Sequence, residues 1–109
     1  MLPPIILSIA GSDCSGGAGI QADIKTISAL GGYAASVITA VTAQNTLGVQ
    51  SVYPIPADMV KAQITSVMDD LRPDAVKIGM VHDASIVTAI VDCLQTYTLE
   101  CIVRSEEHT

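Results

Sequence analysis

A glycine-rich segment at residues 11–19, GSDCSGGAG, is the first part of the sequence whose composition suits binding chemistry. Glycines let backbone N–H groups approach a ligand closely, and the start of a following helix adds partial positive charge. The structural alternative is a tight turn that lets a helix pack closely against a strand. A single glycine loop does not decide between these two interpretations.

Two phosphate-binding motifs nearly fit this segment, and both fail. Gly11 and Gly16 have the spacing of a Walker A loop, but Gly17 and Ala18 stand where Lys and Ser or Thr are needed. A dinucleotide-type G-x-G-x-x-A match at residues 17–22 begins six residues past the preceding apolar run, and no acidic residue between positions 23 and 58 is available for the ribose hydroxyls. The sequence therefore favours neither a P-loop nor an NAD-binding site.

Three side chains outside the loop are candidates for ligand contacts. Gln44 offers one acceptor and two donors at the end of an apolar run, although a loop glutamine often bonds only to backbone. Met80 carries a polarizable sulfur suited to a flat ring, although core packing is the usual role of methionine. Asp23 lies early in a predicted helix, where the helix dipole alone favours a carboxylate.

These residues are placed by an alternating order of strands and helices. Apolar or β-branched runs predict strands at 5–10, 36–43, 49–53, 75–79 and 99–103. Helical spacing predicts three helices between them, with inward faces at Ile20, Ile24, Ile27 and Leu30, at Val60, Ile64, Val67 and Leu71, and at Val87, Ile90, Val91 and Leu94. Asp83 is the expected N-cap of the third helix, and Asp13 with Ser15 is expected to cap the first. The order predicts an α/β fold with an open, mostly parallel sheet and helices on both faces.

Charge and cysteine content exclude several functional classes. The net charge is −6 and the five basic residues are scattered, so no basic stripe favours nucleic acid. Three widely spaced cysteines support neither a zinc site nor a disulfide framework, and Cys14 is interpreted as incidental. His82 has no catalytic partner in the pattern and is assigned to the surface. Without a signal peptide or membrane-spanning run, we expect a cytoplasmic protein that does not bind membranes.

Three blocks in order carry a resemblance to a known family. They are IAGSDCSGGAGIQADIKT at 9–26, TAVTAQNTLGV at 39–49 and RPDAVKIGM at 72–80, within a match that runs from about residue 6 to residue 103. Together they resemble the hydroxymethylpyrimidine/phosphomethylpyrimidine kinases of thiamine biosynthesis, whose fold is ribokinase-like.

The resemblance implies an ATP-dependent kinase that phosphorylates a hydroxymethyl oxygen and then the resulting monophosphate. It implies pyrimidine-binding roles for Gly11, Asp23, Thr42, Gln44 and Met80. ATP and Mg²⁺ are the expected cosubstrate and cofactor, with their binding residues and the catalytic residue in the C-terminal half of such an enzyme. No metal-binding or catalytic residue is predicted within this chain, and the full-length relative is expected to be a homodimer.

The chain itself is expected to be the N-terminal part of one ribokinase-like domain, residues 1–103. Residues 104–109 abandon the apolar pattern and are interpreted as a non-native tail. Without the catalytic half, the 109-residue chain is expected to be inactive alone. Two alternatives remain open, a pyridoxal- or pyridoxine-type vitamin kinase of the same fold and a non-catalytic small-molecule binding module.

Overall fold

A computed structural model describes residues 2–81, 83–99 and 101–104, which form five strands and three helices. In chain order these are β1 (Ile5–Asp13), α1 (Gly19–Ala29), β2 (Tyr33–Asn45), β3 (Gly48–Pro54), α2 (Ala57–Asp70), β4 (Ala75–Ile78), α3 (Ala84–Leu94) and β5 (Ile102–Arg104). His82 and residues 105–109 of the expected tail lie outside the described residues.

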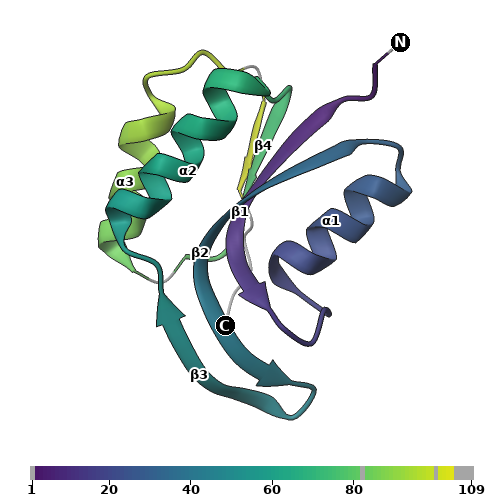
Figure 1. The fold of residues 1–109 in the computed structure, drawn as a ribbon, viewed down its shortest axis with the longest axis vertical. Coiled ribbons are helices and arrows are strands. Elements are labelled where there is room, and N and C mark those ends of the chain that lie inside the picture. The colour runs from purple at the N-terminus through teal and green to yellow at the C-terminus, as the bar shows by residue number, and fades with distance from the viewer. Residues whose placement is uncertain (1, 82, 100, 105–109) are drawn as a thin grey trace.

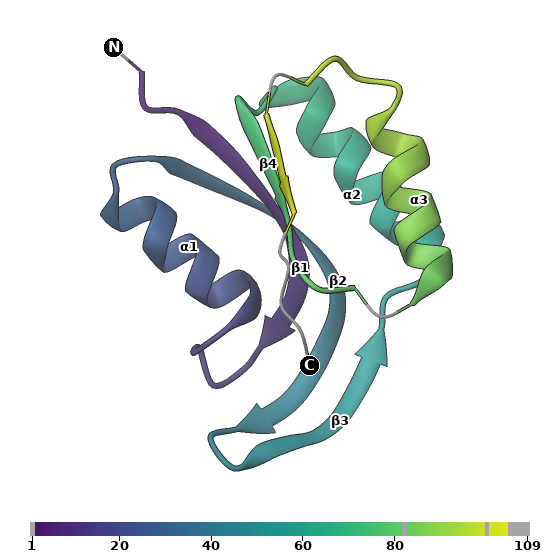
Figure 2. The same ribbon diagram turned by 180° about the vertical axis from the view of Figure 1, so that it is seen from behind.

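The strands form one sheet in the order β3-β2-β1-β4-β5. All neighbouring pairs are parallel except β2 and β3, which form an antiparallel hairpin. Helix α1 covers one face of the sheet, and α2 with α3 covers the other (Figures 1 and 2). The predicted fold class, an open and mostly parallel sheet between helices, is confirmed.

The core lies between the sheet and the α2–α3 layer. Leu7 and Ile9 of β1 point into it, since alternate residues of a strand share a face. The predicted face of α2 is confirmed at Val60 and Ile64, which are fully buried. The buried members of the cluster are Leu7, Ile9, Ala35, Val37, Val60, Ile64, Met68, Val76, Ile86, Ile90 and Leu94.

Two of the predicted helix faces need correction. In α3, Ile90 and Leu94 are buried as expected, but Val91 is exposed and Ile86 is buried instead, because the helix is rotated by about one residue relative to the predicted face. In α1 only Ile20 is buried among the described residues, while Ile24 and the C-cap residue Leu30 are exposed. The N-cap of α3 is confirmed, because the Asp83 carboxylate accepts from the Ser85 N–H at 2.8 Å.

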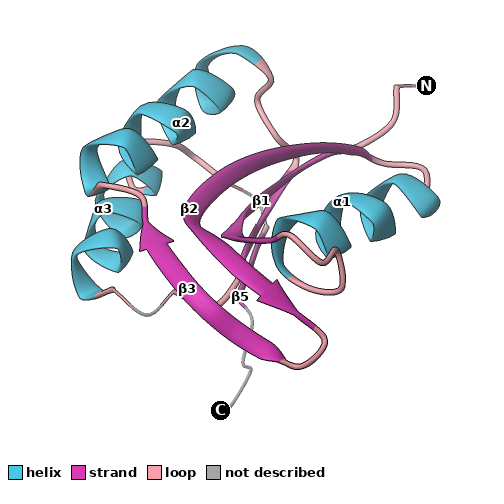
Figure 3. Ribbon diagram, turned by 60° about the horizontal axis from the view of Figure 1, so that its bottom comes forward, coloured by secondary structure: helices cyan, strands magenta, loops and turns pink. Residues whose placement is uncertain are grey.

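Strands β1 and β2 are longer than the sequence predicted. The apolar run of β1 ends at Ala10, but Ser12 and Asp13 still pair with Val41 and Thr42 after a register shift. Strand β2 continues to Asn45 because β3 pairs with its second half, so the hairpin projects beyond the rest of the sheet (Figure 3). Strand β5 begins at Ile102 and includes Arg104, which the sequence had assigned to the tail.

Helix α1 begins at a glycine because no other residue fits there. Gly19 has φ +59°, and a Cβ at this position would overlap the carbonyl oxygen of Gly11. Left-handed backbone alone costs an L-residue roughly 1–2 kcal/mol. The start of α1 is therefore in direct contact with the end of β1.

We expect Gly19→Ala to lower the free energy of unfolding by more than about 2 kcal/mol, since the backbone penalty and the overlap with Gly11 add together. Gly31→Ala is the matched control, because Gly31 has φ +89° but no atom lies within 4 Å of the position that its Cβ would take. Urea unfolding of the purified variants measures both losses. Equal losses for the two variants would show that the contact with Gly11 is not tight.

Candidate functional site

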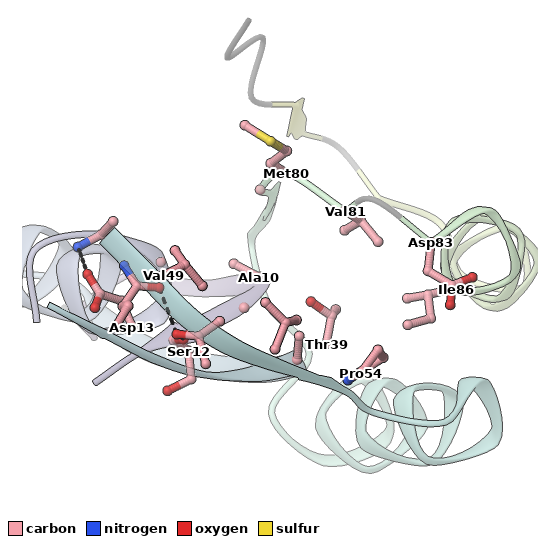
Figure 4. A pocket seen from close by; sticks show the side chains of 18 of the residues that line it. Ala10, Ser12, Asp13, Thr39, Val49, Pro54, Met80, Val81, Asp83 and Ile86 are labelled. Atoms are coloured by element: carbon pink, nitrogen blue, oxygen red, sulfur yellow. Dashed lines mark hydrogen bonds between the residues drawn. The ribbon is translucent and has the colours of Figure 1, made fainter. Parts of the chain in front are cut away.

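A cavity of about 350 Å³ opens at the carboxyl ends of β1, β2 and β4. The strand order places it where the chain passes from β2 on one side of β1 to β4 on the other, which is where open α/β sheets bind ligands. Figure 4 shows Ser12 and Asp13 at the end of β1, with Met80 and Val81 on the segment after β4.

Four of the five residues predicted for the site line this cavity: Gly11, Thr42, Gln44 and Met80. Gln44 belongs to β2 and pairs with Val49 of β3, so it lies within the strand, one residue beyond the predicted strand end at residue 43. The structure thus brings together residues that are 69 positions apart in the chain, from Gly11 to Met80. Asp23, the fifth, does not line the cavity.

The carboxylate of Asp23 is bound from two sides beside the cavity. The Nζ of Lys77 lies 2.9 Å from both of its oxygens, and the Ser8 hydroxyl donates to Oδ2 at 2.6 Å. Ser8 is fully buried and pairs with Lys77 across β1 and β4, so the sheet register sets this arrangement. It is Lys77, not Asp23, that reaches the cavity lining.

Lys77 lines the cavity, although the sequence alone did not single it out. The sequence does contain a feature that marks this residue. Lys77 is the one charged residue in the otherwise apolar run Ala75–Ile78, which forms an interior strand of the sheet. A charge in such a strand needs a partner of opposite sign, and the partner is Asp23 at a separation of 54 residues. That Lys77 pairs with Asp23 can be seen only from the strand register in the structure.

The backbone N–H groups of the glycine loop donate hydrogen bonds to a carboxylate from the same chain, that of Asp13. Oδ1 of Asp13 accepts from the Ser15 N–H and hydroxyl at 2.9 and 2.6 Å, and Oδ2 accepts from the N–H groups of Gly17 and Ala18 at 3.1 and 2.9 Å. Asp13 is only 4% exposed. These bonds, led by that of the Ser15 hydroxyl, hold the pKa of the Asp13 carboxyl below its ordinary value.

Asp13 therefore fills the place where the loop would hold an anion such as a phosphate. The expectation that Asp13 and Ser15 cap the first helix is corrected, because the N-cap is Ala18 and has no side-chain cap. Gln21 of α1 adds two further bonds, accepting from the Asp13 N–H and donating to the Ser12 hydroxyl, each at 2.8 Å. The loop thus forms one wall of the cavity, and its backbone N–H groups bind the Asp13 carboxylate.

Thr42 and Gln44 form a polar group on the β2 side of the cavity. The Thr42 hydroxyl oxygen lies 2.6 Å from the Ser12 carbonyl oxygen and 2.7 Å from the side-chain amide of Gln44. Cys14 is not incidental to this arrangement, since its thiol lies 3.1 Å from the Gln44 carbonyl oxygen and accepts from the Gln44 N–H at 3.3 Å. The backbone of Gln44 is thus held by the glycine loop.

The remaining walls are largely apolar and include Val49, Val52 and Pro54 of β3 with Met80 and Ile86. A small number of polar groups among apolar walls is typical of sites for small organic molecules. Among residues 2–81, 83–99 and 101–104, no group of three His, Cys, Asp or Glu side chains is placed to hold a metal ion. Within the same residues, no helix has the length and apolar character needed to cross a membrane.

Comparison with known proteins points to one family. The family model described as "Phosphomethylpyrimidine kinase" matches residues 13–105. The hydroxymethylpyrimidine/phosphomethylpyrimidine kinase of Escherichia coli K12 is 59% identical over 97 residues, which are 89% of this chain and 36% of that protein. The chain therefore spans little more than a third of the length of this relative.

Solved structures agree with the sequence comparison. A crystal structure of phosphomethylpyrimidine kinase from Clostridium difficile 630 matches with a TM-score of 0.91 at 52% identity, covering 94% of this chain and 44% of that one. Pyridoxal kinase from Staphylococcus aureus, in complex with AMP-PCP and pyridoxal, matches with a TM-score of 0.84 at 30% identity. The match covers 98% of this chain and 40% of the pyridoxal kinase chain. The fold is that of the ribokinase-like vitamin kinases.

The Asp13 carboxylate is expected to stabilise the protein in a pH-dependent way. The pKa of the Asp13 carboxyl is lower in the folded protein than in the unfolded chain. Its contribution to the free energy of unfolding is therefore complete above the unfolded pKa of about 4 and is lost as the pH falls through the folded pKa. Asp13→Asn should therefore be less stable than wild type at pH 7, and the difference should shrink below about pH 4. Urea unfolding at a series of pH values from neutral down to about pH 2.5 measures this difference in the free energy of unfolding.

Asp70→Asn is the control for this prediction, because Asp70 is exposed at the end of α2. It should change the free energy of unfolding little, because its side chain is exposed. A stability difference between wild type and Asp13→Asn that stays constant over the whole pH range would contradict the assigned role of Asp13.

Proposed function

The chain belongs to the phosphomethylpyrimidine kinase family, and we propose that the whole protein transfers the γ-phosphoryl group of ATP to 4-amino-5-hydroxymethyl-2-methylpyrimidine. In this proposal it then phosphorylates the monophosphate, as thiamine biosynthesis requires. The observation that supports it best is the cavity at the end of β1, which gathers Gly11, Thr42, Gln44 and Met80 from the three matching blocks of sequence.

The cavity suits a single ring with polar substituents. Its volume of about 350 Å³ lies near the lower end of the range for small-molecule sites, roughly 300–1,000 Å³. The Gln44 amide pairs with the amino group and ring nitrogen, the Met80 thioether lies on the face of the ring, and Gly11 allows the ring to approach the backbone. Thr42 completes the polar side of the site.

Asp23 takes part through Lys77 in this proposal. The carboxylate is 18% exposed at its side chain and holds the Lys77 ammonium group, which lines the cavity. The ammonium group then donates to a polar group of the substrate, while Asp23 balances its charge and Ser8 fixes the carboxylate. A direct contact between Asp23 and the substrate is not required.

ATP and Mg²⁺ complete the proposed reaction in the whole protein, where they supply the phosphoryl group and neutralise its charge. The described residues do not fit either group. Asp13 occupies the loop amides, and the part of the chain that the structure describes has no group of three His, Cys, Asp or Glu side chains placed to hold a metal ion. These residues are therefore assigned only the binding and orientation of the acceptor alcohol. A homodimer in the cytoplasm, without nucleic-acid or membrane partners, remains part of the proposal.

A pyridoxal-type substrate is the second candidate, favoured by the likeness to the Staphylococcus aureus pyridoxal kinase. The identity to that protein is 30%, against 52% to the Clostridium difficile phosphomethylpyrimidine kinase. A coupled assay of ADP release by the whole protein separates the two substrates. We expect the higher kcat/KM with the hydroxymethylpyrimidine, and a higher value with pyridoxal would favour the second candidate.

Replacing Gln44 tests the proposed site directly. Gln44→Ala leaves the amino group and ring nitrogen of the bound pyrimidine unpaired, which costs about 1–3 kcal/mol. The Kd for the hydroxymethylpyrimidine should therefore rise roughly 5- to 150-fold in calorimetric titration of the whole protein.

Gln95→Ala makes the same chemical change at the exposed C-cap of α3, outside the cavity lining. It should leave this Kd unchanged. An unaltered Kd for Gln44→Ala, or an equal loss in the control, would remove Gln44 from the binding site.

A further inference from the structure

The hydroxyl oxygen of Thr42 makes two short contacts on the wall of the cavity. It lies 2.6 Å from the carbonyl oxygen of Ser12 and 2.7 Å from the terminal amide of Gln44, at the position of Oε1. A hydroxyl group has one proton to donate, and its lone pairs can only accept. Two carbonyl oxygens at these distances therefore cannot both be satisfied by Thr42.

The Ser12 carbonyl fixes where the proton goes. A backbone carbonyl can only accept, and β1 holds it in place beside β2 through the pairing of Ser12 with Val41 and of Asp13 with Thr42. An oxygen–oxygen distance of 2.6 Å is a hydrogen bond when a proton lies between the atoms and a repulsive contact when none does. The Thr42 proton is therefore directed to Ser12.

The lone pairs of Thr42 then require a donor from Gln44. The oxygen and nitrogen of a glutamine amide have nearly the same shape, and the hydrogen-bond network decides which is which. A half-turn of the amide places Nε2 at 2.7 Å from the Thr42 oxygen and converts this contact into an N–H donation. Thr42 and Gln44 are two residues apart on β2, where side chains share a face of the strand.

We propose that Thr42 is a positioning residue that locks the Gln44 amide with its carbonyl oxygen turned to the ligand. The amide then presents an acceptor beside its second N–H donor. This pattern matches an aminopyrimidine edge, in which an amino group donates and the adjacent ring nitrogen accepts. The inference rests on the proposed function, because it assumes that the pyrimidine binds at Gln44.

The lock makes the site selective for an amino over an oxo substituent. A 4-oxo pyrimidine in its lactam form presents the reverse pattern, a carbonyl acceptor beside a ring N–H donor. A freely rotating glutamine amide would fit either pattern by turning over. With Thr42 holding Nε2, the oxo analogue meets oxygen against oxygen and is rejected.

The experiment measures the Kd of the whole protein for 4-amino-5-hydroxymethyl-2-methylpyrimidine and for its 4-oxo analogue. Wild type should prefer the amino compound by roughly ten- to a hundredfold. Thr42→Val keeps the shape of the side chain but removes the hydroxyl group, so the ratio of the two Kd values should fall at least about fivefold. Thr42→Ser keeps the hydroxyl group and should retain the wild-type ratio.

The ratio separates positioning from general damage, since a merely misfolded or weakened site would lose affinity for both compounds alike. A wild-type protein that binds the two compounds equally would overturn the inference even if Thr42→Val does not fold. Full wild-type selectivity in a folded Thr42→Val variant would overturn it as well. If wild type binds neither compound, the proposed function itself fails.

Discussion

The chain crosses from one side of its central strand to the other, and the position of the site depends on this reversal. Strand β2 lies on one side of β1 and β4 on the other, so right-handed connections carry α1 and α2 to opposite faces of the sheet. The segments that follow β1 and β4 therefore separate at the carboxyl edge. Every residue assigned to the ligand lies at or next to this opening.

Internal polar pairing keeps the opening in shape. Asp13 accepts the N–H groups of the glycine loop, and Asp23 balances Lys77 beside the buried Ser8 hydroxyl. Each carboxylate has its partners within the chain, so burial carries no unpaired charge. Among the residues that line the cavity, we propose the Gln44 amide and the Lys77 ammonium group for polar contacts with the ligand.

The sequence predicts the architecture well, because apolar runs and helical spacing report burial directly. The family resemblance implied that Gly11, Gln44 and Met80 share a binding site, and all three line one cavity. The sequence does not predict that Asp13 folds back into the loop, that β2 extends through Gln44, or that Lys77 pairs with Asp23. Those features depend on strand register and on contacts between distant segments, which local patterns do not contain.

A crystal structure of the whole protein with 4-amino-5-hydroxymethyl-2-methylpyrimidine bound tests the central claim most directly. The ring should lie in the cavity against the Met80 thioether, with its amino group within about 3.2 Å of the Gln44 side-chain oxygen. A ring bound where neither Gln44 nor Met80 touches it would contradict the assignment of this cavity as the substrate site.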